Sequence, residues 1–315
     1  MMKLLELLTN KGLNINLDSD GILSYLLLKK CLKDTKIVGF NNSDHYIWST
    51  RNKFENTNND IFIDIFLPKK DVICIDQHVI STMPEDLIEF KENKLNPHLL
   101  IEQHHALNSS YMTKFPFQTF LFIMAMIERE NNKINGIDYY AKIPNIENDI
   151  LFIDFILRGD GVLENYVKYK PNITNWSKKL LSFSNNGTNT KLILDYLFNL
   201  SDDEALNKTK TISDFYLKYN LAKDGGYNTK FGFIDNLKII NMFMRSYANY
   251  IGVDLEKRIE TIYQYNGQTH IFKNDTLPLI NLSRLDTYAF VANDRLSCTT
   301  NIRYNKRFTD VTFYN

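Results

Sequence analysis

The stretch NINLDSDGILS, residues 14–24, decides the fold of this chain. A short apolar segment leads to Asp18 and Asp20, then to Gly21 and to an apolar helix expected to begin at about Ile22. At the end of a β-strand, side chains at i and i+2 point to the same face, so we expect the two carboxylates to lie together at the edge of a sheet. A divalent cation such as Mg2+ or Mn2+ would offset their repulsion. An ordinary turn is the alternative, since Asp-x-Asp-Gly is common in loops.

Three later aspartates also accompany apolar segments. Asp64 lies inside the run 61–66, Asp76 ends the run 71–76, and Asp160 follows an apolar segment between two glycines. A buried acid in such a run is unfavourable unless it is paired or bound to a metal. Four apolar elements, each with an acid at or near its end, predict an α/β fold with a parallel sheet. The site is expected at the carboxyl ends of its strands.

The order of these motifs resembles the DHH phosphoesterase superfamily, particularly its RecJ-like and oligoribonuclease-like members. The matching positions are the Asp-x-Asp-Gly-x-x-Ser of 18–24, Asp64, the Asp-Gln-His of 76–78 and Gly159-Asp160. Asn-Pro at residues 96–97 falls where RecJ-like members often carry the same pair. The resemblance implies a parallel-sheet catalytic domain that hydrolyses phosphoesters with two divalent cations.

The resemblance also implies roles for individual residues. The metal ligands would be Asp18, Asp20, Asp64, Asp160, Gln77 and Asn16, with Asp64 bridging two Mn2+ or Mg2+ ions. The catalytic residues would be His78, Asp64 and Asp76. His78 would bind the scissile phosphate, and Asp76 would orient its neighbour from the second layer of contacts. A hydroxide activated by the cations would attack phosphorus in line.

Two positions depart from the family pattern. Asp76-Gln77-His78 stands in place of Asp-His-His, and Asn16 (or Asn14, depending on the pattern used) replaces a His or Asp ligand. Amide oxygens bind Mg2+ or Ca2+ but are weaker ligands than imidazole for Mn2+. Either the site holds one cation well and another poorly, or it no longer turns over. A further alternative is that His78 moves in as the missing ligand.

Arginines are the candidate phosphate contacts, because the guanidinium matches phosphate geometry in a bidentate manner. Arg158, next to Gly159-Asp160, is expected to hold a phosphate, to neutralise the acids or to form a structural salt bridge. Arg284 and Arg303 are candidates for the substrate-binding surface. The alternative for both is a solvated position on a strand.

Composition narrows the class of protein. The 315 residues suit two domains, and 37 basic against 37 acidic residues give a formal net charge of zero. This balance argues against a broadly basic nucleic-acid coat, although it leaves room for a local basic channel. Three cysteines without paired spacing indicate a reducing compartment, so we expect a cytoplasmic protein. No apolar stretch is long enough to span a bilayer, so no membrane partner is expected.

The chain is expected to fold as α/β in three consecutive parts. Residues 1–183 would form the DHH-like catalytic domain, 184–222 a helical linker, and 223–315 a smaller mixed α/β domain resembling the family's substrate-binding domain. In the family, a Gly-rich turn with a His grips the nucleotide end. The turn Asp224-Gly225-Gly226 lacks that His, so none of the domain's residues carry over by motif.

Two functions from different classes follow. The first is a metal-dependent phosphodiesterase or nuclease acting on short single-stranded nucleic acid or a nucleotide. The alternative is a catalytically inactive DHH-fold protein that binds nucleic acid, a nucleotide or a protein partner. The amides at Asn16 and Gln77 favour the alternative, whereas retention of four mutually repelling acids opposes it. An unrelated Rossmann-like nucleotide binder is disfavoured, because no Gly-x-Gly-x-x-Gly follows the first strand. The substrate and the oligomeric state stay open.

Overall fold

The computed structural model describes residues 4–41, 46–50, 60–65, 72–77, 93–102, 114–131, 134, 137–142, 149–219, 221, 237–255, 259–260, 263–273, 296–303 and 308–314. Its contacts divide the chain into two compact units, each assembled from discontinuous segments. The first unit comprises Met1–Asn10, Leu17–Thr35 and Phe115–Glu260. The second comprises Lys11–Asn16, Lys36–Lys114 and Thr261–Asn315.

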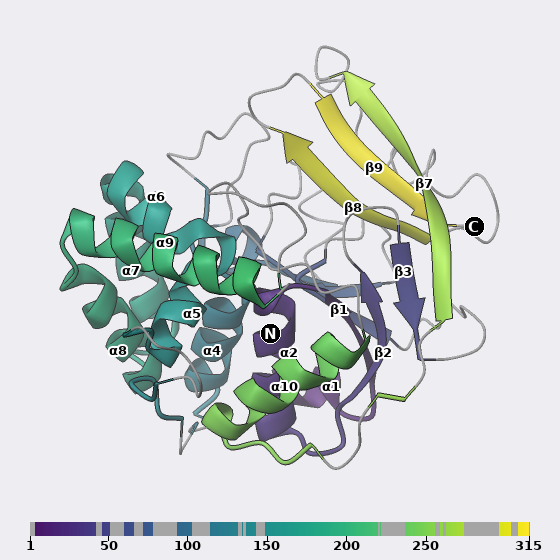
Figure 1. Ribbon diagram of the computed structural model, residues 1–315, viewed down its shortest axis with the longest axis horizontal. Helices are drawn as coiled ribbons and strands as arrows, with labels where there is room; N and C mark the ends of the chain where they lie inside the picture. Colours follow the sequence, from purple (N-terminus) through teal and green to yellow (C-terminus); the bar gives the residue numbers. More distant parts are fainter. Residues whose placement is uncertain are drawn as a thin grey trace. The chain divides into compact units, whose positions relative to one another are not determined.

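The second unit contains one nine-stranded sheet with the order β6-β5-β4-β1-β2-β3-β7-β9-β8. Figure 1 labels β1, β2, β3, β7, β9 and β8 of this sheet. The strands are β1 (Gly12–Asn16), β2 (Lys36–Asn41), β3 (Tyr46–Ser49), β4 (Asp60–Ile63), β5 (Ile73–Ile75), β6 (Lys94–Leu95), β7 (Tyr263–Lys273), β8 (Leu296–Arg303) and β9 (Phe308–Tyr314). The five strands from β6 to β2 pair in parallel, whereas β3, β7, β9 and β8 pair in antiparallel fashion. The predicted α/β class with a parallel sheet is therefore confirmed.

Strand β1 lies between β2 and β4 and sets the order of the parallel strands. Leu13 and Ile15 are fully buried, and all four residues of β4 are buried as well. Strands buried on both faces carry near-continuous apolar runs, as the Ile61-Phe62-Ile63 segment of β4 does, whereas apolar and polar residues alternate in β1. The chain passes from β1 to β2 on one side and later returns to β4 on the other. This reversal is the kind of point where open α/β sheets bind ligands, beyond the carboxyl ends of their strands.

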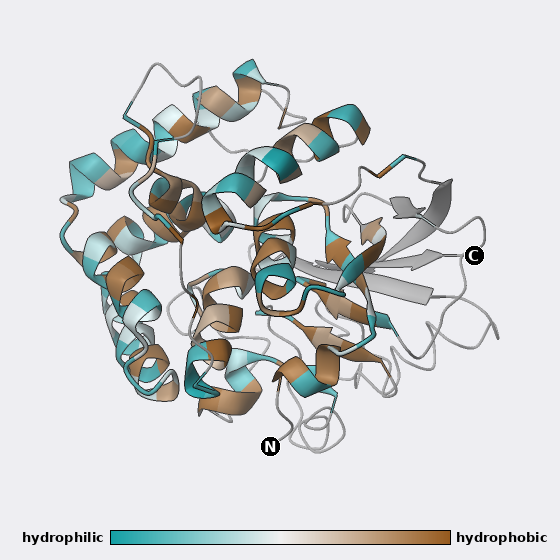
Figure 2. Cartoon of the chain, turned by 90° about the horizontal axis from the view of Figure 1, so that it is seen from below, coloured by the Kyte–Doolittle hydropathy of each residue, from teal (hydrophilic) through white to brown (hydrophobic). Residues whose placement is uncertain are grey.

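The first unit is helical. Its helices are α1 (Leu4–Leu8), α2 (Ser19–Cys31), α4 (Thr119–Arg129), α5 (Phe152–Arg158), α6 (Val162–Lys168), α7 (Lys170–Phe183), α8 (Thr188–Phe198), α9 (Asp202–Lys218) and α10 (Leu237–Ile251). Hydrophilic and hydrophobic residues alternate along most of them, as expected for helices that bury one face (Figure 2). In α4, by contrast, every residue from Thr119 to Ile127 is buried. Within the described residues, no helix has the length and apolar character needed to cross a membrane.

The start of α2 corrects the local geometry expected from the sequence. The strand ends at Asn16 and the helix begins at Ser19, with Asp18 as its N-cap. Oδ1 of Asp18 accepts a hydrogen bond of 2.9 Å from the backbone N–H of Gly21. Asp20 lies in the first helical turn, so the two carboxylates do not share one face of a strand end. Capping favours this earlier start, because it satisfies an N–H group that the first turn would otherwise leave unpaired.

The two units divide the chain differently from the three consecutive parts expected at 1–183, 184–222 and 223–315. Helices α8 and α9 do lie in the segment 184–222. Strand β7, from beyond residue 222, pairs with β3 in the same sheet as β1. Sequence patterns follow chain order, whereas compact units follow contacts, and strand pairing joins distant segments.

Gly12 of β1 provides a test of this sheet. A β-carbon added there would lie 2.6 Å from Oδ1 of Asp60 and 2.7 Å from Cγ1 of Val38. We expect Gly12→Ala to lower the free energy of unfolding by about 1–3 kcal/mol, because the central strand has no room for the methyl group. Adding Val38→Ala should recover part of that loss, measured by denaturant unfolding. Equal stability of Gly12→Ala and the wild type would contradict the packing around β1.

Candidate metal centre

Polar residues form one row along the carboxyl edge of the parallel sheet in the second unit. Ile15, Ile63, Ile75 and Leu95 are aligned across β1, β4, β5 and β6. The residue after each of them is polar; these residues are Asn16, Asp64, Asp76 and Asn96. The hydrogen bonds between the strands extend to this row. The backbone N–H of Asp64 donates to the carbonyl oxygen of Ile75, and that of Asp76 donates to the carbonyl oxygen of Leu95. Asp64 and Asp76 therefore follow parallel strands, and their role as site residues stays a prediction.

Asn16 and Asp64 are in direct contact at the point where the strand order reverses. Nδ2 of Asn16 donates a hydrogen bond of 3.1 Å to Oδ2 of Asp64. Asn16 thus meets Asp64 as a donor, through its amide nitrogen. Asp64 is 2% exposed and has a φ of 58°, in the left-handed region that non-glycine residues seldom adopt. Such strained positions are frequent at ligand sites, so the geometry singles out Asp64 independently of the motif.

Asp20 forms the centre of the acidic group in the first unit. Its carboxylate accepts hydrogen bonds of 2.8 Å from the backbone N–H groups of Thr119 and Phe120, in the first turn of α4. Ser24, one turn later in α2, donates to the same carboxylate at 3.4 Å. Negative charge is favourable at a helix N-terminus, where N–H groups lack intrahelical partners. Asp20 therefore links α2 to α4 across 99 residues of sequence.

Asp160 brings a second carboxylate to Asp20. An oxygen of Asp20 and an oxygen of Asp160 lie within 4.8 Å of each other. Burial, followed by the charges of Asp160 and Asp18, raises the pKa of Asp20 well above its usual range. The N–H groups of Phe120 and Thr119 act in the opposite direction. Burial and repulsion prevail, so the ionised pair needs a proton or a cation for stability.

A tight turn after α5 positions Asp160. Gly159–Gly161 form a short 3-10 turn in which Asp160 has a φ of 51° and Gly161 a φ of 67°. Nδ2 of Asn165 donates to the backbone oxygen of Asp160 at 3.3 Å. Asp is among the residues that tolerate this backbone, whereas most others resist it. Asp64 and Asp160, both singled out by their motifs, thus share an unusual conformation.

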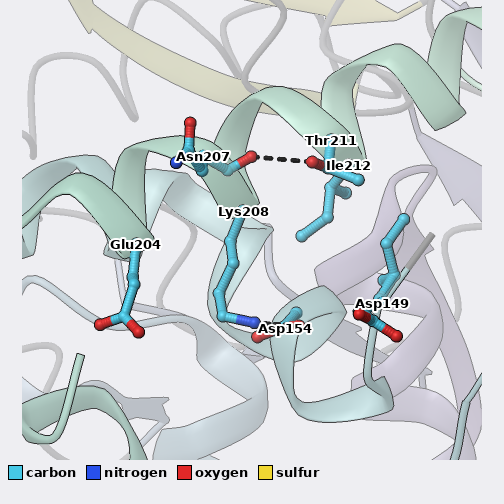
Figure 3. A pocket seen from close by; sticks show the side chains of 8 residues that line it. Asp149, Asp154, Glu204, Asn207, Lys208, Thr211 and Ile212 are labelled. Atoms are coloured by element: carbon cyan, nitrogen blue, oxygen red, sulfur yellow. Dashed lines mark hydrogen bonds and ion pairs between the residues drawn. The ribbon is translucent and has the colours of Figure 1, made fainter. Parts of the chain in front are cut away.

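The start of α5 is fixed by a buried network around Asp154, at a pocket of ≈ 460 Å³ (Figure 3). Asp154 is 1% exposed and accepts hydrogen bonds from the Lys208 ammonium at 2.9 Å and the Tyr196 hydroxyl at 2.7 Å. The backbone N–H of Leu151 donates to Oδ2 of Asp154, the oxygen that also accepts from Lys208, at 3.1 Å and so caps the start of α5. Burial and the Asp154 carboxylate raise the pKa of Tyr196, so its phenol stays a donor. This network anchors the helix that leads to Asp160.

Arg158 occupies the last turn of α5 and has no exposed surface. Its Nη2 donates to Oγ of Ser213 at 3.2 Å, and its Nη1 lies 3.8 Å from a carboxylate oxygen of Glu164. Burial raises the pKa of the adjoining Tyr216 to about 12, an effect that the Arg158 charge reduces. These contacts correspond to the structural salt bridge that the sequence left open. Contact with a phosphate stays a prediction.

Two further predicted site residues, Asp76 and Gln77, are buried and directly follow β5. His78 and Arg284 lie outside the described residues, and Arg303 ends β8, where only the backbone is described. Gln118 was missed. Its position, directly before an apolar helix that follows Pro116, is the signal that could have identified it as a helix cap beside the site.

Comparisons with protein-family models, with curated proteins and with solved structures found no match.

The raised pKa of Asp20 predicts a pH-dependent stability. The folded state binds this proton more tightly than the unfolded chain, whose pKa is near 3.8. The stabilisation is therefore full below that pKa and is lost as pH rises through the raised, folded-state pKa. In EDTA, the difference in free energy of unfolding between Asp20→Asn and the wild type should shift in favour of the variant as pH rises from 5 to 8. A constant difference would contradict burial of an ionisable Asp20.

The Asp154 network provides a second stability test. We expect Lys208→Met to lower the free energy of unfolding by about 1–3 kcal/mol, because it removes the cation from a buried carboxylate. Lys191→Met is the matched control, since Lys191 pairs with Asp195 on the exposed face of α8. An exposed pair of this kind contributes only about 0.3–0.5 kcal/mol. Equal effects in urea denaturation would mean that Asp154 does not depend on Lys208.

Proposed function

We propose that this protein is a metal-dependent phosphoester hydrolase, a phosphodiesterase or nuclease that acts on short single-stranded nucleic acid or a nucleotide. The observation that carries the proposal is the carboxylate pair formed by the buried Asp20 and the half-buried Asp160, with oxygens within 4.8 Å of each other. Such a pair is unfavourable by itself, and a hard divalent cation with oxygen ligands is its natural counter-charge. The order of motifs from Asp18 to Asp160 supports phosphoester chemistry.

The residues present fit Mg2+ or Mn2+. Carboxylate and amide oxygens are the ligands these cations prefer, and Asp18, Asp20, Asp64, Asp160, Asn16 and Gln77 supply only such groups. Two cations are proposed, as the resemblance implies. When bound, they would lower the pKa of a bound water and stabilise charge on the phosphoryl oxygens. His78 is proposed to bind the scissile phosphate, and Asp76 to orient its neighbour.

Within each unit, the chain holds these groups in place before any ligand arrives. The N–H groups of Thr119 and Phe120 orient the Asp20 carboxylate, and Asn16 orients that of Asp64. The turn at Gly159–Gly161 fixes Asp160. Preorganised ligands lose little conformational entropy on binding, which favours a defined coordination geometry.

The catalytically inactive, nucleic-acid- or nucleotide-binding alternative is favoured by one specific contact. Asn16 donates its amide N–H to Asp64. This hydrogen bond from a neutral side chain stabilises a carboxylate that family members hold with a metal. A hydrogen bond from a neutral amide needs no cation, and it persists whether or not the site turns over. The two functions therefore differ in turnover and not in fold.

Hydrolysis assays with Asp64→Asn test the enzyme directly. The substrates are 5′-labelled short single-stranded DNA and RNA and bis-p-nitrophenyl phosphate, each with Mn2+, Mg2+ or EDTA. We expect metal-dependent cleavage by the wild type and at least a ~100-fold lower kcat in the variant, because charge in the transition state loses its stabilisation. Asp195→Asn, on the exposed face of α8, is the control and should keep full activity.

Two other results would contradict the hydrolase. Absence of turnover with every substrate, together with tight binding of the strand in fluorescence anisotropy, would replace the hydrolase by the binding protein. Cleavage that survives in EDTA or in Asp64→Asn would contradict the metal-dependent mechanism.

A further inference from the structure

Gln118 carries a buried amide oxygen that the described residues leave unsatisfied. It is the N-cap residue of α4 and is 1% exposed, yet its side chain makes no capping hydrogen bond. Its Oε1 accepts no hydrogen bond from any residue in the described part of the chain. The usual capping role at this helix is taken by Asp20, whose carboxylate accepts from the next two N–H groups. A buried amide oxygen without a partner is unfavourable, and a bound ligand would satisfy it.

The Gln118 side chain lies beside Gly159, the residue before Asp160. A β-carbon added to Gly159 would lie 3.0 Å from Cγ of Gln118, 3.4 Å from its Nε2 and 3.7 Å from Cβ of Asp20. Cγ and Nε2 of Gln118 and Cβ of Asp20 therefore lie around the same point, directly before Asp160 in the chain. The absence of a side chain at Gly159 leaves this space to Gln118. All four residues belong to the first unit.

We propose that Gln118 is an additional ligand, whose Oε1 binds the divalent cation held by Asp20 and Asp160. The inference rests on the cation required by the proposed function and adds a ligand that its motifs do not include. A neutral oxygen suits this position, because a third carboxylate would increase the repulsion around Asp20 in the absence of the cation. Carboxamide oxygens are ordinary ligands of hard divalent cations.

The contacts of Asp20 are compatible with this role. Each carboxylate oxygen offers two lone pairs, so hydrogen bonds from α4 leave acceptor capacity for a cation. The same N–H groups orient both oxygens. Gln118 is the N-cap residue of the same helix and directly precedes the two residues that donate these N–H groups. One helix terminus thus positions an acidic ligand through its backbone and an amide ligand through its first side chain.

Direct titration of Mn2+ tests the ligand without relying on activity. The full chain, stripped with EDTA and dialysed, is titrated with Mn2+ while free Mn2+ is followed by electron paramagnetic resonance. Gln118→Met keeps the length of the side chain and removes the oxygen. We expect its Kd for Mn2+ to rise at least about tenfold. Its melting temperature in EDTA should match or exceed that of the wild type, because an unsatisfied buried group has been removed.

Thr190→Val is the matched control. Thr190 is fully buried in the same unit, and its Oγ1 also lacks a partner among the described residues, but it lies in α8. The substitution likewise removes an unsatisfied polar atom, so any general effect on stability should be shared. Its Kd for Mn2+ should equal that of the wild type.

Gln118→Glu supplies a second, independent readout. It keeps the donor oxygen and adds a negative charge beside Asp20. Mn2+ should therefore raise the melting temperature of this variant by more than it raises that of the wild type. An equal or smaller rise overturns the proposal, and this comparison stands even if Gln118→Met fails to fold.

The outcomes separate this inference from the proposed function. An unchanged Kd in Gln118→Met would overturn the ligand assignment and leave the acidic metal centre intact. Failure of the wild type to bind Mn2+ would overturn both. Mn2+ binding that depends on Gln118, in a protein without hydrolytic activity, would support the ligand and reject the enzyme.

Discussion

The carboxylate of Asp20 is the group on which the arrangement of the first unit depends. It extends from α2, accepts two N–H groups of α4 and faces Asp160, which follows α5. Capping favours the ionised form, whereas burial and the neighbouring acids oppose it and raise the pKa. The charge of this carboxylate therefore depends on protons and on any cation that binds beside it.

The second unit provides a different kind of order. Parallel pairing aligns the last residues of β1, β4, β5 and β6, so the polar residues that follow them share one edge. Backbone pairing places these residues at one edge whatever their side chains are. The residue types then decide which ligands the edge can bind. Asp64 stands apart because its φ of 58° is unfavourable for most side chains. Asp160 has the same property, and in both cases the surrounding turn maintains the conformation.

Two amides, Asn16 and Gln77, follow strands β1 and β5 of the second unit. Asn16 serves as a hydrogen-bond donor to Asp64, and Gln77 is buried. Amide oxygens are weaker ligands than imidazole for Mn2+, whereas Mg2+ prefers oxygen ligands. In the first unit, the ligand proposed at Gln118 is likewise an amide oxygen.

The sequence by itself determined the α/β class, the parallel strands and the presence of acids after β4 and β5. These features follow from local patterns: apolar runs with polar ends report burial and strand direction directly. Tertiary structure alone decided that Asp20 caps α4 and that Gln118 lies near Asp20. It also decided that β7 joins β3 in the sheet of β1. Such contacts join residues about a hundred or more positions apart, and local periodicity carries no information on which distant N–H group a buried carboxylate will meet.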